Sequence, residues 1–255
     1  MESKAARDLA ERLAGTVLSQ DPGAPARMRA RLAQLSGRDW VRLDESMRRR
    51  YWSPLDVTGW PARLGADDGG IAAVAGSMDR DGLVREAAVA VLAQTPGRVA
   101  AAALAVRTAD WVPQVGSAAV AAVRERTAVE DVVVIVPVLL AMADRRRGRL
   151  AAKAILAGLA AGPAGTLAGL SGTGERGGRM WALGALAGRG LLPAALLEGR
   201  AMRDPDPVIA LWCAGQLAAQ PGWQAAGAGP RLLGSVGWRL GCSRNWTRRA
   251  RSGRG

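Results

Sequence analysis

Apolar residues recur in the middle of the chain in blocks that share one template. Counting from Asp110 as zero, apolar residues stand at plus five, plus eight, plus nine and plus thirteen, which are Val115, Ala118, Ala119 and Val123. The same template fits the segments that begin at Asp79 and Asp204. Spacings of three and four residues place side chains on one face of a helix, so each block predicts an amphipathic helix.

The blocks repeat at a nearly constant interval. Two further copies, at 148–156 and 178–186, fill the gap before Asp204. The last apolar position of the five copies advances by 31, 33, 30 and 31 residues, through Leu92, Val123, Leu156, Leu186 and Leu217. Another apolar segment precedes each copy, at 71–78, 99–107, 132–143, 163–170 and 191–202. Helix pairs repeated with a period in the thirties predict an all-α solenoid.

Acidic residues stand where the second helix of a pair should begin. Asp110, and either Asp204 or Asp206, are predicted N-caps whose carboxylates accept hydrogen bonds from free backbone amides. Pro113 and Pro207 then fall in the first helical turn, where a missing N–H costs little. The polar lead before each apolar run is therefore interpreted as a helix start.

These units resemble HEAT repeats, on the turn Asp79, the Arg85 six residues later and the V-R-E-A-A run that contains it. The resemblance covers about 71–217 and implies a right-handed α-solenoid of about five antiparallel helix pairs. It also implies a ladder of Asp and Arg side chains between neighbouring pairs, with the candidates Asp79, Arg85, Asp110, Arg149, Arg179 and Asp204. The ladder is incomplete, because Gly116 and Ala210 occupy the Arg position in two copies. Pro137 matches a proline typical of the family's first helix.

The ends of the chain differ from the repeats. Residues 1–60 are predicted to form an N-terminal helical cap, in which Leu9, Leu13 and Val17 lie on one face. Residues 61–222 form the predicted repeat array. Residues 223–255 contain seven basic and no acidic residues, lack apolar periodicity, and are predicted to be a disordered basic tail.

Composition excludes several kinds of chemistry. The chain has no His, which removes Ser-His-Asp triads, H-E-x-x-H zinc sites and histidine proton relays. Its two cysteines, Cys213 and Cys242, form neither a zinc motif nor a disulfide framework, so a cytoplasmic setting is expected. No signal peptide is apparent, and the apolar run at 132–143 is too short to span a bilayer. We expect no membrane association, no metal and no cofactor.

Three other motifs each allow a structural and a functional interpretation. GTGERG at 172–177 matches the dinucleotide fingerprint G-x-G-x-x-G, but no strand context surrounds it, which favours a loop between repeats. Trp111 follows a turn acid and is the candidate exposed anchor among nine tryptophans that otherwise suit core packing. Arg145, Arg146 and Arg147 occupy the equivalent turn of the next copy, as a solvated turn or a contact for an acidic partner.

Charge and architecture together favour a binding protein. The net charge is +13, but residues 53–222 hold 17 basic and 15 acidic residues, so the array contributes only +2. The tail adds +7, and contacts nucleic-acid phosphates or serves only for solubility. We predict a non-enzymatic scaffold that binds a protein partner. The alternative is a nucleic-acid-binding HEAT-like protein, such as a DNA glycosylase for alkylated bases. The sequence leaves the oligomeric state open, and a fragment of a longer array is a further alternative.

Overall fold

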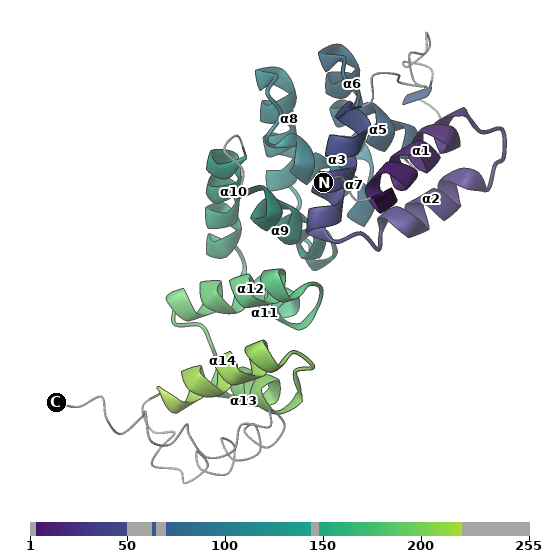
Figure 1. Ribbon diagram of the computed structural model, residues 1–255. Coiled ribbons are helices and arrows are strands. Elements are labelled where there is room, and N and C mark those ends of the chain that lie inside the picture. Colours follow the sequence, from purple (N-terminus) through teal and green to yellow (C-terminus); the bar gives the residue numbers. More distant parts are fainter. Residues whose placement is uncertain (1–3, 50–62, 65–69, 144–147, 221–255) are drawn as a thin grey trace. The chain divides into compact units, whose positions relative to one another are not determined.

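The computed structural model describes residues 4–49, 63–64, 70–143 and 148–220, and every regular element within these ranges is an α-helix (Figure 1). The all-α prediction is therefore confirmed for the described residues. The predicted tail and the Arg145 to Arg147 turn lie outside them. The chain divides into two compact units, Met1–Ala185 and Leu186–Gly255, which are described separately below.

Three helices form the N-terminal part of the first unit: α1 (Lys4–Leu18), α2 (Ala24–Leu32) and α3 (Gly37–Arg49). The apolar face predicted in α1 is buried, since Leu9, Leu13 and Val17 are at most 9% exposed. In front of α3, the Ser36 hydroxyl oxygen accepts the backbone N–H of Asp39 at 3.2 Å. This side-chain contact supplies an acceptor for an amide that the first turn of a helix leaves free.

The repeat segments fold as alternating helices, at the positions that the sequence period predicts. The first helices of the pairs are α5 (Ile71–Gly76), α7 (Arg98–Arg107), α9 (Val129–Ala143), α11 (Ala164–Gly172) and α13 (Ala194–Arg203). The second helices are α6 (Gly82–Gln94), α8 (Pro113–Arg124), α10 (Arg149–Ala161), α12 (Arg176–Gly188) and α14 (Pro207–Ala218). GTGERG runs from the last residue of α11, through the loop at 173–175, into the first two residues of α12, so a helix and not a strand precedes this loop. The loop joins the two helices of one pair, whereas the sequence predicted a loop between repeats.

The helix starts differ from the prediction by two residues in one copy. Pro113 and Pro207 are the first residues of α8 and α14, as predicted. Asp206 is the N-cap of α14 and accepts the Val208 N–H at 2.9 Å. The expectation that Asp110 caps α8 is wrong, because Val112 is the N-cap residue. Asp110 instead accepts the Val112 N–H at 3.0 Å from two residues upstream, in a short turn that leaves its carboxylate free for other contacts.

Within the first unit, neighbouring helices follow the order of the pairs. The helices α5, α7, α9 and α11 contact one another in sequence, and α6 contacts α8, which contacts α10. The helix α3 packs across α7 and α9 and thereby covers the first helices of two successive pairs (Figure 1). Because α3, α6, α8 and α9 all contact α7, every residue of α7 from Val99 to Arg107 is buried.

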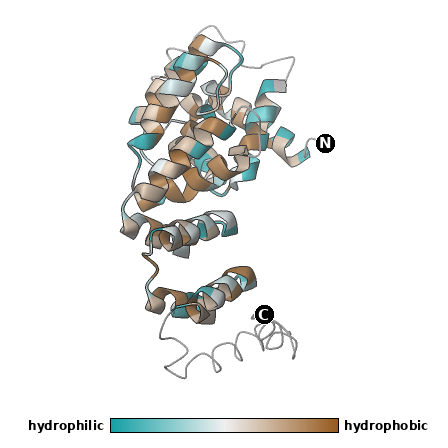
Figure 2. Ribbon diagram, turned by 90° about the vertical axis from the view of Figure 1, so that its left-hand side faces the viewer, coloured by the Kyte–Doolittle hydropathy of each residue, from teal (hydrophilic) through white to brown (hydrophobic). Residues whose placement is uncertain are grey.

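The core of this unit consists mainly of alanine, valine and leucine. Figure 2 shows apolar residues gathered among the packed helices of this unit. The helix α7 buries five alanines between Ala100 and Ala105, and small side chains allow helix axes to approach at the short end of the usual 8–10 Å range. The core also contains Trp40 of α3, which is only 2% exposed. Close helix packing thus replaces the missing phenylalanines.

One such close approach joins α3 to a proline inside α9. A Cβ atom added to Gly37 would overlap the backbone of Pro137 and lie 2.6 Å from the Val138 nitrogen. The Gly37 N–H donates to Glu175 Oε1 at 2.7 Å, from the residue just before α12. Pro137 has no N–H, so α9 lacks one internal hydrogen bond at this point. The glycine lets α3 pack directly against the helix backbone there.

The second unit contains the pair α13 and α14, which pack against each other. Its core consists of Leu197 and Ala201 from α13 and of Ile209, Cys213 and Leu217 from α14. Burial raises the pKa of the Cys213 thiol to about 11, so the thiol stays protonated at neutral pH and is a poor nucleophile.

No single helix among the described residues is long and apolar enough to cross a membrane. The helices α10 and α11 reach that length and hydropathy only together, and they bend by 108° at the break between them.

We expect Gly37→Ala to lower the free energy of unfolding by about 1–3 kcal/mol, because the added methyl group meets backbone and not a flexible side chain. Urea unfolding followed by circular dichroism measures the change. Gly15→Ala in α1 is the matched control, since a Cβ there meets nothing within 4 Å. The control should raise stability by about 0.5–1 kcal/mol. Equal behaviour of the two variants would contradict the close approach.

Candidate functional site

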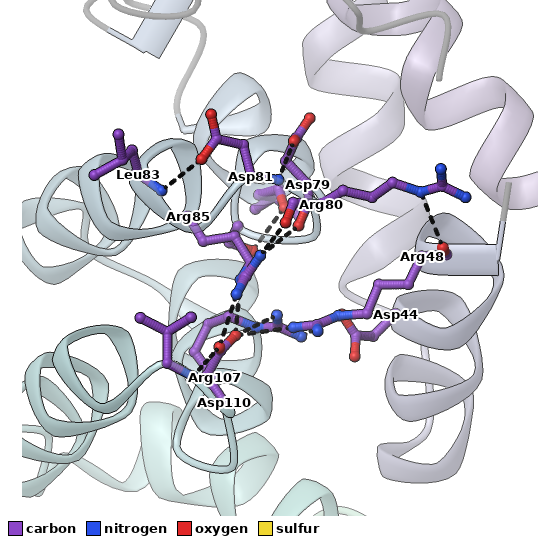
Figure 3. Close-up of polar contacts among 12 residues, drawn as sticks. Asp44, Arg48, Asp79, Arg80, Asp81, Leu83, Arg85, Arg107 and Asp110 are labelled. Atoms are coloured by element: carbon purple, nitrogen blue, oxygen red, sulfur yellow. Dashed lines mark hydrogen bonds and ion pairs between the residues drawn. The ribbon is translucent and has the colours of Figure 1, made fainter. Parts of the chain in front are cut away.

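A buried cluster of charged side chains connects the first two complete helix pairs (Figure 3). Its centre is Asp110, in the turn between α7 and α8, whose side chain is fully buried. Arg85 of α6 donates to both carboxylate oxygens, from Nε at 2.9 Å and Nη2 at 3.0 Å. Arg107 donates at 3.0 Å and Arg48 at 2.8 Å. One carboxylate therefore accepts hydrogen bonds from three guanidinium groups.

Arg85 makes contacts with its own turn as well as with Asp110. Its Nη1 donates to the backbone carbonyl oxygens of Asp79 at 3.0 Å and Arg80 at 2.7 Å. Both carbonyls lie in the turn between α5 and α6. The guanidinium, which is completely buried, thus fixes the turn before α6 and at the same time reaches the next pair.

The helix α3 enters this cluster through Asp44 and Arg48, which lie one helical turn apart. Arg48 Nε donates to Asp44 at 3.1 Å, and Arg107 forms an ion pair with the same carboxylate. Arg107 Nε has no hydrogen-bond partner within the described residues. The cluster holds three arginines and two aspartates, and it attaches the N-terminal helices to the repeats.

The positive charges in the cluster keep Asp110 ionised. Burial alone would raise the pKa of Asp110, but the hydrogen bonds from Arg85 and Val112 and the charges of Arg107 and Arg48 lower it below the ordinary value. Burial also lowers the pKa of Arg107, against the opposing effect of Asp44. A carboxylate that is buried and shared by three cations has no surface for a substrate, so Asp110 suits a structural role.

The predicted ladder residues share one local geometry. In three copies the turn aspartate accepts the backbone N–H of the residue two positions later: Asp81 to Asp79 at 2.8 Å, Val112 to Asp110 at 3.0 Å, and Asp206 to Asp204 at 2.9 Å. Arg149 donates to Ala143 O at 3.4 Å, which repeats the contact of Arg85 with the residue six positions earlier. Arg179 is buried at the start of α12. Arg85 and Asp110 form the contact that joins two pairs.

Trp111 projects from this cluster into solvent. Its side chain is 61% exposed, and its ring lies over the Arg85 guanidinium, with 5.5 Å between the guanidinium carbon and the ring centroid. Leu83, in the first turn of α6, is 74% exposed. The starts of α6 and α8 adjoin, because a Cβ on Gly82 would lie 3.4 Å from a methyl group of Val112. We call Trp111 and Leu83 the exposed apolar pair.

The other tryptophans in the described residues are more enclosed. Trp40 is buried, and Trp181 and Trp212 are half-buried. Trp52 and Trp60 lie outside the described residues, as do Arg145, Arg146 and Arg147, so the structure does not test the basic turn. Sequence reasoning missed Arg107, Asp44 and Arg48. The spacing of Asp44 and Arg48 by four residues was the available signal, but it indicates only a local helix pair.

The described residues hold no group of three or more acidic or cysteine side chains that could bind a metal ion. No protein-family model, no curated protein and no solved structure matches this chain. The assignment to HEAT repeats therefore stays a prediction from the repeat pattern.

We expect Asp110→Asn to lower the free energy of unfolding by about 3–5 kcal/mol, because it leaves three buried or half-buried arginines without their shared counter-charge. Urea unfolding of both proteins at neutral pH measures the loss. Glu86→Gln, an equal charge change on the exposed face of α6, should leave the midpoint almost unchanged. Equal losses from both variants would contradict the central place of Asp110.

Acid should remove this contribution of Asp110. Its folded pKa lies below its unfolded pKa of about 3.9, so the stabilisation is complete above the unfolded pKa and falls as pH drops through the folded pKa. The difference in unfolding free energy between the native chain and Asp110→Asn should therefore be constant from about pH 5 to 8 and shrink below about pH 4. A difference that stays constant down to acid unfolding would refute this account.

Proposed function

We propose that this chain is a non-enzymatic HEAT-like α-solenoid that binds a protein partner through the exposed apolar pair. The observation that supports it best is Trp111, a large aromatic side chain that stays exposed while a buried ion pair orients it from below. Tryptophan is enriched among the residues that dominate binding energy at protein interfaces.

The helix contacts agree with a stacked array of pairs. In the first unit α5, α7, α9 and α11 contact one another in sequence, as do α6, α8 and α10, and Arg85 connects the turns at the start of α6 and α8. At the other end of α6, Arg126 donates to the backbone oxygens of Leu92 at 2.9 Å and Thr95 at 2.6 Å. Links at both ends of a helix fix its neighbour in orientation and in register, as an array that offers an extended surface requires.

The surroundings of Trp111 reduce the entropy lost on binding. The guanidinium of Arg85 cannot move freely, because it makes two hydrogen bonds to Asp110 and two to backbone oxygens. A cation under the face of an aromatic ring is attracted to the electron density of that ring, and this attraction restricts the motion of the Trp111 side chain. An ordered anchor loses less conformational freedom when a partner closes over it. Leu83 adds a second exposed apolar side chain at the start of α6, which adjoins the start of α8.

Charge distribution argues for a protein partner over nucleic acid. A surface that follows a nucleic-acid backbone needs clustered basic residues, whereas residues 53–222 have a net charge of only +2. Asp110, the acid nearest to Trp111 in sequence, is buried beneath three arginines and not available as a catalytic base.

We expect Trp111→Ala to weaken partner binding by about thirtyfold or more, the loss typical of a central aromatic contact. Affinity capture with the full chain, quantified by mass spectrometry, identifies the proteins that the variant loses; titration with the purified partner then gives the fold-change. Leu18→Ala on α1, which removes an apolar side chain that is 40% exposed, is the matched control. Proteins retained equally by both variants would contradict the proposed surface.

Two assays on the full chain separate this function from nucleic-acid chemistry. Binding of random-sequence duplex DNA across a salt series measures phosphate contacts, and base release from methylated DNA measures glycosylase activity. We expect no released base, and no DNA binding that depends on Trp111. Base release that Trp111→Ala abolishes would replace the proposed function with the enzymatic alternative.

A further inference from the structure

A small pocket of about 210 Å³ lies at the end of α8, away from Trp111. The end of α8, the loop that follows it, α9, α10 and the start of α11 together form its wall. Its floor consists of the buried side chains of Val132, Ile155 and Leu167. An apolar cavity of about 150 Å³ is large enough to hold a benzene ring, so this pocket accommodates one ring or one short branched chain.

The hollow exists because α10 presents small residues on one side. Ala154 and Gly158 line the pocket from one face of α10, four residues apart, and Gly162 lines it from the position just after the helix. A Cβ atom added to Gly158 would meet no atom within 4 Å, so the space beside it is open. Glycine inside a helix costs about 0.5–1 kcal/mol relative to alanine. The sequence therefore leaves open, at a cost in stability, a space that a larger side chain would fill.

The rim of the pocket is polar and carries one charge. Arg124, at the last position of α8, is the only charged residue among those that line it, and it is exposed. Thr127 and Thr166 also line the pocket, and Thr166 Oγ1 donates to Thr127 O at 3.3 Å. Arg126 is already occupied by Asp131 and by the end of α6. Arg124 is therefore the arginine that can donate hydrogen bonds to a ligand in the pocket.

We infer that this pocket binds a small hydrophobic carboxylate, with its ring or branched chain on the floor and its carboxylate on Arg124. The match is one of size and charge: an apolar floor for one ring, and a single guanidinium at the rim that makes charge-assisted hydrogen bonds to a carboxylate. A free arylalkyl or branched acid and the C-terminal residue of a peptide both have this chemistry. The site lies apart from the exposed apolar pair and does not depend on the function proposed for it.

The test uses phenylacetate with the full chain, and phenylacetamide as the uncharged match. Saturation-transfer NMR detects binding, and titration gives a dissociation constant, expected to be about a millimolar for a ligand of this size. Phenylacetamide should bind about fivefold more weakly, and Arg124→Gln should weaken phenylacetate by about the same factor. An acetylated dipeptide that ends in phenylalanine competes with phenylacetate if the pocket also takes peptide ends.

The decisive variant fills the pocket without harming the helix. Gly158→Leu places a side chain in open space and replaces a poor helix former by a good one, so the protein should stay folded while phenylacetate binding is lost. Gly15→Leu, also in open space but on α1, should bind as the native chain does. Binding that survives Gly158→Leu, or no binding of phenylacetate at ten times the expected constant, overturns the inference. Either result leaves the partner experiment with Trp111→Ala unaffected.

Discussion

The carboxylate of Asp110 is the one group on which four helices depend. It accepts hydrogen bonds from Arg48 of α3, Arg85 of α6 and Arg107 of α7, and it also holds the turn that begins α8. Three cations brought together in a protein interior would repel one another without it. The acid lies in the turn between α7 and α8, so the group that neutralises the arginines also fixes the start of α8 relative to α6. The orientation of Trp111 follows from it, since Arg85 lies beneath that ring.

The need for such a polar cluster follows from the composition of the core. Helices that meet through alanine gain little buried apolar area per residue, and alanine surfaces offer few ridges that would prevent one helix from sliding along another. A bidentate pair such as Arg85 with Asp110 has one good geometry, so it fixes register where packing does so weakly. The contact between Gly37 and Pro137 also fixes the register of two helices. Gly37 is the one glycine of α3, and no larger residue could lie so close to the backbone of α9. Specificity in this unit thus comes from a few directed contacts.

The sequence could predict what depends on local pattern. The repeat period located the ten helices of the five pairs in the described residues, because apolar residues recur at the same positions in each copy. It could not predict that α3 packs across α7 and α9, since at least 48 residues of the chain lie between α3 and these helices. Arg107 looked like the polar end of an apolar helix, and only the position of Asp44 makes it a buried ion-pair partner. The pocket was also missed, because Gly158 in a glycine-rich chain signals nothing until its neighbours are known.

The two candidate sites lie at opposite ends of one helix. Trp111 lies two residues before the first residue of α8 and Arg124 is its last residue, and a helix of 12 residues is about 18 Å long. That separation exceeds the Debye length of about 8 Å at physiological salt, so charge at the pocket has little direct effect on a partner at Trp111. Coupling between the sites would require α8 to move as a body. Arg85 with Asp110 holds its start, and Val115, Ala119 and Val123 are fully buried along its length. A helix fixed in this way transmits little movement from one end to the other. The geometry therefore favours two sites that bind their ligands independently.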